Sequence, residues 1–192
     1  WEVKVNQMPF MQRLQDGSLP LRTLQIFFQN WGAWTIEINT LVACSYHRFL
    51  PFYKSQRDLM APLGEKIADE FIHPKPPGHY LVMMETAKAL GLTEDDIFAW
   101  PMLSEFRAKI DFVRGIIYEG TAAEWYSCIT TEEQIGHWSG LCFKALTQHY
   151  GLTPEQATYF GTHQEADLEE HVGGVMGHGS FNRLALQRLL ES

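Results

Sequence analysis

The feature that most constrains the fold is a long stretch of apolar residues at helical spacing near the start of the chain. Between Leu21 and about Phe49 they recur every three or four positions: Leu24, Phe27, Phe28, Trp31, Trp34, Ile38, Leu41 and Val42. This period places them on one face of an α-helix. Ser18 and Pro20 suit its N-terminus, and Pro51 closes it. The stretch predicts one long helix that packs against others.

The rest of the chain follows the same pattern, and no segment shows the sustained period-two alternation of a strand. Glycines, prolines and capping residues separate the other expected helices. Five of these are Pro9 to Gln15, Tyr53 or Pro62 to Phe71, His79 to Leu90, Met102 to Tyr118, and Ala122 to Tyr150. The capping box Thr153-Pro154-Glu155-Gln156 begins a further helix that runs to about Val172, and Ser180 caps a last helix that ends at Leu190. The sequence therefore predicts an all-α bundle of about seven or eight helices, in a single domain over residues 1–192.

Charge and composition disfavour several classes of protein. Fifteen Lys and Arg face 23 Asp and Glu, so the net charge of -8 argues against nucleic-acid binding and against an anionic membrane. No apolar run reaches the roughly 18–20 residues that a membrane span needs. Cys44, Cys128 and Cys142 form no CxxC pair or disulfide framework, so we expect a reducing, cytoplasmic location. Because the chain begins at Trp1, we also expect that an N-terminal segment is missing.

Metal-binding side chains gather in three places, the first of them around residue 163. At 100° per residue, His163, Asp167 and Glu170 fall within about 60° of one another on a helix surface. His171 lies about 80° from His163 and is the alternative to Glu170. An imidazole with carboxylates on one face suits Fe or Mn. A solvated acidic helix face would carry the same residues, so the pattern alone leaves both interpretations open.

The second place is the rigid connection His73–Gly78, which contains three prolines. Glu70 ends the helix before it and His79 begins the helix after it. A tight, stiff connection can bring these two side chains to one point. Glu65 and His73 are weaker candidates in the same region, and surface placement is the alternative for all of them.

The third place is Glu132-Glu133-Gln134, inside what the sequence presents as one long apolar helix. One of the two glutamates must lean toward the apolar side, and a buried carboxylate needs a partner. A metal ion is one such partner and a neighbouring Arg is the other. Together, the Glu, His, Glu and His-x3-Asp pattern on successive helices is the donor set that an O2-activating pair of iron ions needs.

Over nearly its whole length the chain resembles the heme-oxygenase-like di-iron oxidases, relatives of TenA (thiaminase II), PqqC and CADD. The stretches that carry the resemblance are Met8-Pro9-Phe10 to Leu19, Lys66-Ile67-Ala68-Asp69-Glu70 with His79-Tyr80-Leu81, Glu132-Glu133-Gln134, and Tyr159-Phe160 with His163 and Asp167. The resemblance implies a TenA-like bundle around a central pocket, with the metal ligands Glu70, His79, Glu132, His163 and Asp167. The chain departs from the family at the sixth ligand, where the usual histidine is replaced by Glu170, with His171 one residue later. Either Glu170 is the sixth ligand, or a helix distortion brings in His171, or the ligand is lost and the site holds one iron or none. A second departure is Gln7-Met8, where relatives often have Asn-His.

The resemblance implies a non-heme iron enzyme, with a di-iron centre or with Mn in place of Fe, that uses O2 on a small organic acid or amine. A homodimer is the expected assembly. Two alternatives stay open: a metal-free TenA- or PqqC-like hydrolase or cofactor-type oxidase, with Cys128 as candidate nucleophile, and a non-catalytic ligand-binding or regulatory protein. Arg48, Arg107 and Arg114 are candidates to bind a substrate carboxylate. The candidate pocket walls are Phe27, Trp31, Trp34, Tyr46, Phe112, Trp125 and Trp138.

Overall fold

The computed structural model of the chain describes residues 2–168 and 176–191, without the side chains of residues 2, 3, 133 and 164–168. Within these ranges there is no strand, which confirms the all-α prediction. The helices are α1 (Glu2–Asn6), α2 (Pro9–Gln15), α3 (Leu21–Arg48), α4 (Leu50–Ser55), the 3-10 helix η1 (Arg57–Leu59), α5 (Met60–Phe71), α6 (His79–Ala89), α7 (Glu94–Phe98), α8 (Ser104–Glu119), α9 (Ala122–Ile129), α10 (Glu132–His149), α11 (Thr158–Leu168) and α12 (His178–Leu190). The expected count of about seven or eight matches only the helices of 11 residues or more. None of the described helices has both the length and the apolar character that crossing a membrane requires.

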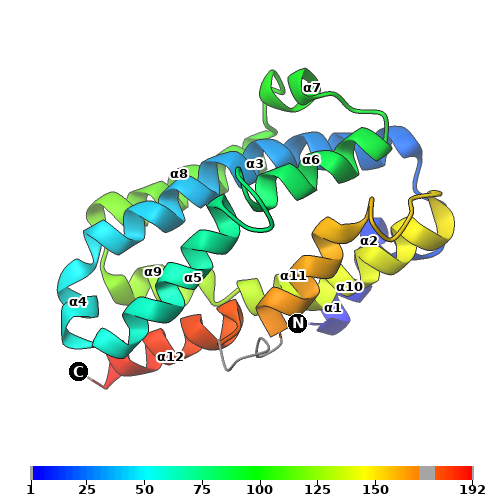
Figure 1. Cartoon of the computed structure of the whole chain (residues 1–192). Coiled ribbons are helices and arrows are strands. Elements are labelled where there is room, and N and C mark those ends of the chain that lie inside the picture. The colour runs from blue at the N-terminus through cyan, green and yellow to red at the C-terminus, as the bar shows by residue number, and fades with distance from the viewer. Residues whose placement is uncertain (1, 169–175, 192) are drawn as a thin grey trace.

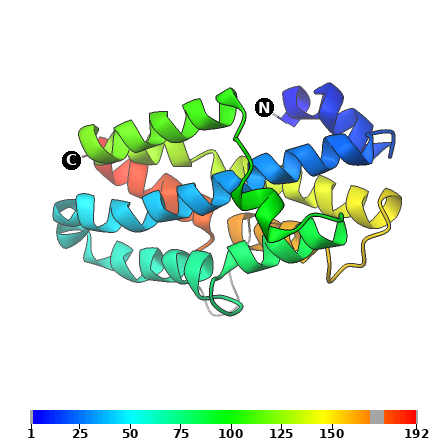
Figure 2. The same cartoon turned by 90° about the horizontal axis from the view of Figure 1, so that it is seen from above.

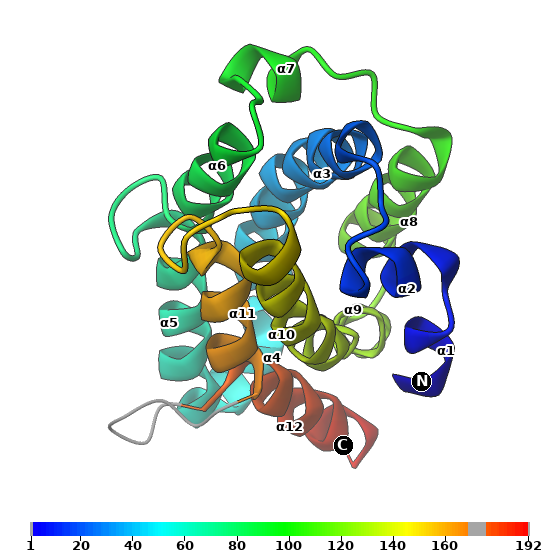
Figure 3. The same ribbon diagram turned by 90° about the vertical axis from the view of Figure 1, so that its right-hand side faces the viewer.

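The longest helix, α3, is the axis around which the others are arranged. It runs along the molecule and contacts both α6 and α8 (Figure 1). Seen from above, α8 lies along one side of α3, and α5 and α6 lie along the other (Figure 2). Viewed along the bundle, α10 and α11 lie side by side across from α3, and α7 stands at the outer edge (Figure 3). A small cavity in the interior of the bundle is bounded by residues of α3, α5, α10, α11 and α12.

Two hydrophobic clusters meet along α3. Phe28 and Trp31 on its N-terminal half belong to the first cluster. Leu41 and Val42 on its C-terminal half belong to the second, and Ile38 packs against both. The long helix predicted from the apolar spacing thus spans both clusters and buries the face that the spacing defines. The candidate site described below lies where the two clusters adjoin.

The prediction of one helix from residue 122 to residue 150 is wrong, because the structure divides it into α9 and α10. The break falls at Thr130 and Thr131. Consecutive β-branched residues have low helix propensity. Each of their hydroxyls donates, at 3.0 Å, to the carbonyl oxygen three residues before it. Glu132 therefore begins a helix, whereas the sequence placed it inside one.

Two other helix starts also differ from the prediction. Helix α12 begins at His178, so Ser180, the expected cap, lies inside its first turn. Thr153 and Gln156 exchange the expected hydrogen bonds, at 2.9 and 3.3 Å, but these close a turn, and α11 begins at Thr158. The expected end of that helix lies outside the described residues. Elsewhere α2, α3, α5 and α6 end within about two residues of the predicted positions.

Candidate metal site

The loop between α5 and α6 brings Glu70 and His79 together. Glu70 is the penultimate residue of α5 and His79 is the first residue of α6. Gly78 has a φ of +78°, and a Cβ there would lie 2.3 Å from the carbonyl oxygen of Glu70. Only glycine allows both this conformation and this close approach. The loop can therefore fold back on α5, and Glu70 Oε1 lies 3.4 Å from His79 Nδ1.

His163 reaches the same point from α11. Its ring centroid lies 4.7 Å from that of His79. Its Nδ1 lies 2.8 Å from the carbonyl oxygen of Tyr159, one turn earlier. Because a carbonyl can only accept, Nδ1 carries the proton and the lone pair of the neutral ring is on Nε2. One ligand atom from each of Glu70, His79 and His163 lies within 4.8 Å of the others, and these three residues are called the triad below.

The position of His163 depends on an aromatic support. The hydroxyl of Tyr159 accepts a hydrogen bond of 2.7 Å from Trp31 Nε1, which joins α11 to the central helix. The Tyr159 ring also packs against His163, with centroids 4.2 Å apart. In metal sites, a hydrogen bond donated by the second nitrogen of a histidine orients the ring toward the ion, and contacts that fix the acceptor residue support this orientation.

The triad places charge inside an apolar bundle. The side chains of His79 and Glu70 are 4% and 13% exposed. Burial opposes the ionisation of Glu70, but the neighbouring His79 and His163 lower the pKa of its carboxyl to about 2. Burial likewise opposes protonation of His79, but the Glu70 carboxylate raises the pKa of His79 above its ordinary value. Glu70 is therefore ionised throughout the physiological range, which is the form that binds a cation.

The triad meets three requirements of a transition-metal site. His79 Nδ1 is buried, and its nearest described partner is the Glu70 carboxylate at 3.4 Å, too long for a well-formed hydrogen bond, so a cation between the two would improve the pairing of both. Bonds of 2.0–2.2 Å to a metal place two ligands of one ion at most about 4.4 Å apart. Because the three ligand atoms lie within 4.8 Å of one another, binding one ion needs at most a small side-chain adjustment. Two histidines and one carboxylate are the donors of mononuclear Fe(II) oxygenases.

Glu132 makes a different set of contacts. Its Oε2 accepts a hydrogen bond from the Lys66 ammonium and another, of 2.6 Å, from Asn182 Nδ2. The partner of this half-buried carboxylate is thus a lysine, where the sequence suggested a metal ion or an arginine. In the part of the chain that the structure describes, Glu132 does not belong to the group within reach of one ion. The side chain of Glu133 lies outside that part.

The remaining expected ligands fall at or beyond the end of α11. Asp167 lies on this helix one turn after His163, but its side chain is outside the described part of the chain. Glu170 and its alternative His171 lie outside the described residues altogether. The described triad therefore contains three of the six ligands that the resemblance implies.

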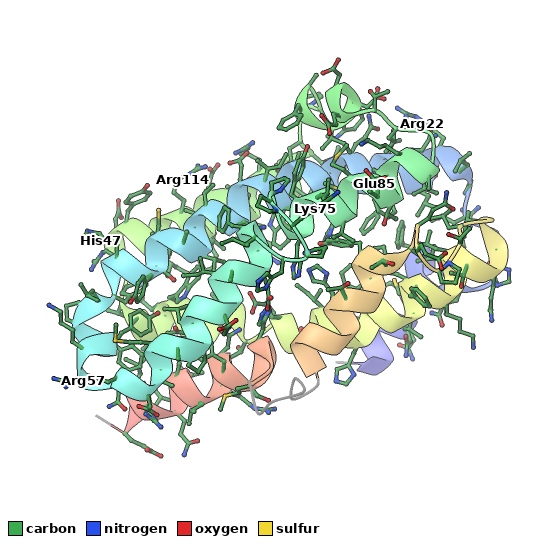
Figure 4. All side chains as sticks on the ribbon, viewed as in Figure 1. Arg22, His47, Arg57, Lys75, Glu85 and Arg114 are labelled. Atoms are coloured by element: carbon green, nitrogen blue, oxygen red, sulfur yellow. The ribbon has the colours of Figure 1, made fainter. Side chains whose placement is uncertain are left out.

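Two cavities adjoin the triad. The inner one has a volume of about 50 Å³, and its lining includes Glu70 and His163 from the triad, with Trp31, Trp34, Glu132, Tyr159 and His178. It has room for a few small molecules such as water or O2, whereas organic ligands occupy several hundred Å³. The outer one has a volume of about 400 Å³, and its lining includes His79, Asp69, Glu85 and Glu155. Glu85 lies on α6, near the side that α11 approaches (Figure 4). The triad therefore stands between a small interior space and a larger outer one.

Four polar residues around the triad were not predicted as functional: Lys66, Asp69, His178 and Asn182. His178 Nε2 lies 3.0 Å from Asp69 Oδ2. Burial opposes the ionisation of Asp69, but His178 and His73 hold the pKa of its carboxyl below the ordinary value. A signal existed for Lys66, which precedes Glu70 by four residues and so shares its helix face. No local signal marks His178 and Asn182, because α12 brings them to the site from the far end of the chain.

The weaker candidates do not belong to the triad, although His73 lines the outer cavity with His79. Glu65 is exposed. Half of the His73 side chain is exposed, and its Nδ1 lies 3.0 Å from Asp69 Oδ1. Cys128 lines a separate cavity with Phe112 and others, and burial raises the pKa of its thiol above the ordinary value. A thiol with a raised pKa is a weak nucleophile, so nothing in this arrangement favours the cysteine-based alternative.

The candidate arginines and aromatic residues divide between surface and interior. Arg107 and Arg114 both bind the carboxylate of Glu37, at 2.7 and 3.0 Å, and therefore already have a carboxylate partner. Arg48 donates to the carbonyl of Gly120 at 3.3 Å. Of the proposed pocket walls, Trp31 and Trp34 do line the inner cavity, whereas the others do not. Phe112, for example, is 63% exposed.

Comparison with known proteins does not assign the chain to a family. No model of a known protein family matches it. A search of curated proteins finds no significant match. A functional conclusion therefore rests on the residues and on their arrangement.

Proposed function

We propose that this chain is a non-heme iron enzyme that uses O2 to oxidise a small organic amine, on the heme-oxygenase-like bundle of the TenA relatives. The observation that carries the proposal is the convergence of Glu70, His79 and His163 from three helices beside a small interior cavity. This donor set leaves coordination positions open for O2. The order of these residues along the chain is the order that the family resemblance implies.

The outer cavity favours an amine over an acid as the substrate. Its lining includes the carboxylates of Asp69, Glu85 and Glu155, and none of the described residues that line it is Lys or Arg. Glu85 is paired with Lys88 at 3.2 Å, and Asp69 contacts His73 and His178, each at 3.0 Å. Glu155 has no lysine or arginine within ion-pair distance in the described part of the chain, so it is the carboxylate most available to an ammonium group. An ammonium group is attracted by such a lining and a carboxylate is repelled. His79 lines the same cavity, so a substrate there would lie next to the triad.

Iron bound at the triad would supply the activation of O2. The chain itself would exclude bulk water, since Trp31, Trp34 and Tyr159 enclose the inner cavity. It would also hold the His163 ring in one orientation through the hydrogen bond from Nδ1 to the Tyr159 carbonyl. Both roles require only contacts that exist before any ligand binds.

Reduction of O2 consumes protons, and one pair of residues is suited to carry them. Asp69 lines the outer cavity and His178 lines the inner one. Their side chains are joined across 3.0 Å, from Asp69 Oδ2 to His178 Nε2. In this proposal His178 releases a proton to the interior from its other ring nitrogen, Nδ1, and Nε2 takes up a proton from outside through Asp69.

Metal analysis of protein purified with added ferrous iron under anaerobic conditions tests the proposal. The wild type should retain at least about one iron per chain. His79→Ala and His163→Ala should each retain less than about a tenth of that amount, because each removes a ligand. His47→Ala is the matched control: His47 is exposed at the far end of α3 (Figure 4) and should leave the iron content unchanged.

Oxygen consumption by the iron-loaded protein tests turnover and substrate class. Size-matched amines and carboxylic acids are compared, and we expect uptake with amines only. Less than about half an equivalent of iron, unchanged in the histidine variants, would contradict the metal site. Iron retention without O2 uptake on any compound would favour the ligand-binding alternative.

A further inference from the structure

A lysine is buried beside the candidate metal site. Lys66 stands one turn before Glu70 on the same face of α5, and its side chain is 2% exposed. Its ammonium donates to Glu132 Oε2 and, at 3.2 Å, to Asn182 Oδ1. Lysine is among the residues least often buried, unless its charge is paired.

Asn182 forms hydrogen bonds with both the lysine and the glutamate. Its side chain is fully buried on α12. Its Nδ2 donates to Glu132 Oε2 at 2.6 Å and to the carbonyl of Ile129 at 3.1 Å, while its Oδ1 accepts from Lys66. Lys66, Glu132 and Asn182, called the lysine cluster below, thus join α5, α10 and α12 through hydrogen bonds that leave no donor of the amide unused.

The lysine cluster and the triad share one cavity. Glu132 and Glu70 both line the inner cavity, together with His163. In a two-metal centre, a carboxylate in the position of Glu132 would bind the second cation. Here Oε2 of Glu132 already accepts two hydrogen bonds, one of them from a cation.

We infer that the Lys66 ammonium takes the place of a second metal ion at Glu132, so that the centre holds a single iron at Glu70, His79 and His163. The inference rests on the proposed function, because it assumes that the triad binds iron. One ammonium balances one carboxylate, so Glu132 has no unpaired charge left to offer. A second divalent ion at Glu132 would also face the ammonium at contact distance, where like charges repel strongly in a buried site. The triad alone supplies the two histidines and one carboxylate of a one-iron centre.

Metal stoichiometry tests the inference directly. The full chain, freed of metal, is titrated with ferrous iron without oxygen, desalted and analysed for iron. The same protein loaded with Mn(II) is examined by electron paramagnetic resonance, which distinguishes an isolated ion from a coupled pair. The wild type should bind about one ion and give the spectrum of an isolated ion. Glu132→Gln should bind about one ion with an affinity within roughly threefold of the wild type.

Lys66→Met provides the reciprocal test, since it frees the Glu132 carboxylate at similar side-chain volume. We expect it to bind about two ions, whereas Lys54→Met, which removes an exposed lysine charge on α4, should bind one. If Lys66→Met does not fold, the number of ions bound by Glu132→Gln and the spectrum of the Mn(II)-loaded wild type test the inference without it.

The failures of the two proposals are distinguishable. Two ions in the wild type with a coupled spectrum, reduced to one in Glu132→Gln, would overturn the inference and leave the iron function standing. A folded Lys66→Met protein that binds one ion would overturn it as well. A wild type that binds no ion would overturn the proposed function together with the inference.

Discussion

Glu70 shows how one residue couples the candidate site to stability. Its carboxyl has a pKa of about 2 in the folded chain against a usual value of 4.5, and the pKa of His79 is raised above 6.5. The Glu70 contribution is complete above about pH 4.5 and is lost as the pH falls toward 2. The His79 contribution is complete below about pH 6.5 and is lost as the pH rises through its folded value. Both contributions to stability are therefore fully present only between about pH 4.5 and about pH 6.5.

A substitution at this residue isolates the effect. In a chelator, we expect the free energy of unfolding of the wild type to exceed that of Glu70→Gln by on the order of 2 kcal/mol at pH 5.5. The difference should shrink toward pH 3, as Glu70 becomes protonated in the unfolded chain. Urea unfolding at several pH values measures it. A difference that does not change with pH would mean that charge is not its source.

At the scale of the element, the loop before α6 depends on Gly78. Gly78→Ala would place a Cβ against the Glu70 backbone at a left-handed φ, so we expect a loss of at least about 2 kcal/mol in stability. We also expect loss of iron, because the loop sets the spacing of Glu70 and His79. Gly64→Ala is the control, since its Cβ would meet nothing within 4 Å. As a helical position, it should gain up to about 1 kcal/mol. Urea unfolding and iron analysis compare the two variants. Equal stability and equal iron content in Gly78→Ala and Gly64→Ala would mean that the loop geometry does not matter.

The start of α9 offers a second test at this scale. Thr121 caps the helix and exchanges hydrogen bonds with Glu124 in a capping box. Thr121→Ala should cost about 1 kcal/mol, since it leaves helix N–H groups unpaired. Ser180→Ala should cost nothing, because Ser180 lies within the first turn of α12 and Gly177, not Ser180, is the residue that caps that helix. Denaturant midpoints measure the stability of both variants. Equal losses of stability would indicate that Ser180 does cap α12.

Elements with local signals were predictable from the sequence, and those that depend on distant contacts were not. The apolar period of α3 and the left-handed Gly91 after α6 are encoded within a few turns of chain. The break at Thr130–Thr131 was missed because the apolar pattern continues through it, while the hydroxyl contacts that end α9 leave no period in the sequence. The proximity of Glu70 and His79 followed from a short rigid loop. The pairing of Glu132 with Lys66 did not, because 66 residues separate the partners.

At the scale of the whole molecule, iron should stabilise the fold. The triad takes its ligands from α5, α6 and α11, and it exists only when these helices are assembled. A ligand that binds only the folded state at about 100 times its dissociation constant adds about 2.7 kcal/mol. For a chain of this size that corresponds to a rise of roughly 5–10 °C in Tm. Scanning fluorimetry with and without Fe(II) measures the shift. His79→Ala should show none, and an equal shift in that variant would place the binding elsewhere.

The wide separation of the lysine cluster along the chain has a consequence for how the protein is made. Lys66 and Asn182 are 116 residues apart. At about 5–20 residues per second, the ribosome adds the second roughly 6–23 s after the first. Until then the ammonium on α5 lacks its amide partner, and the bundle around the inner cavity is open on the side of α12. If the triad binds iron as proposed, the cavity beside it is therefore completed only when α12 has been synthesised and has packed against α5 and α10.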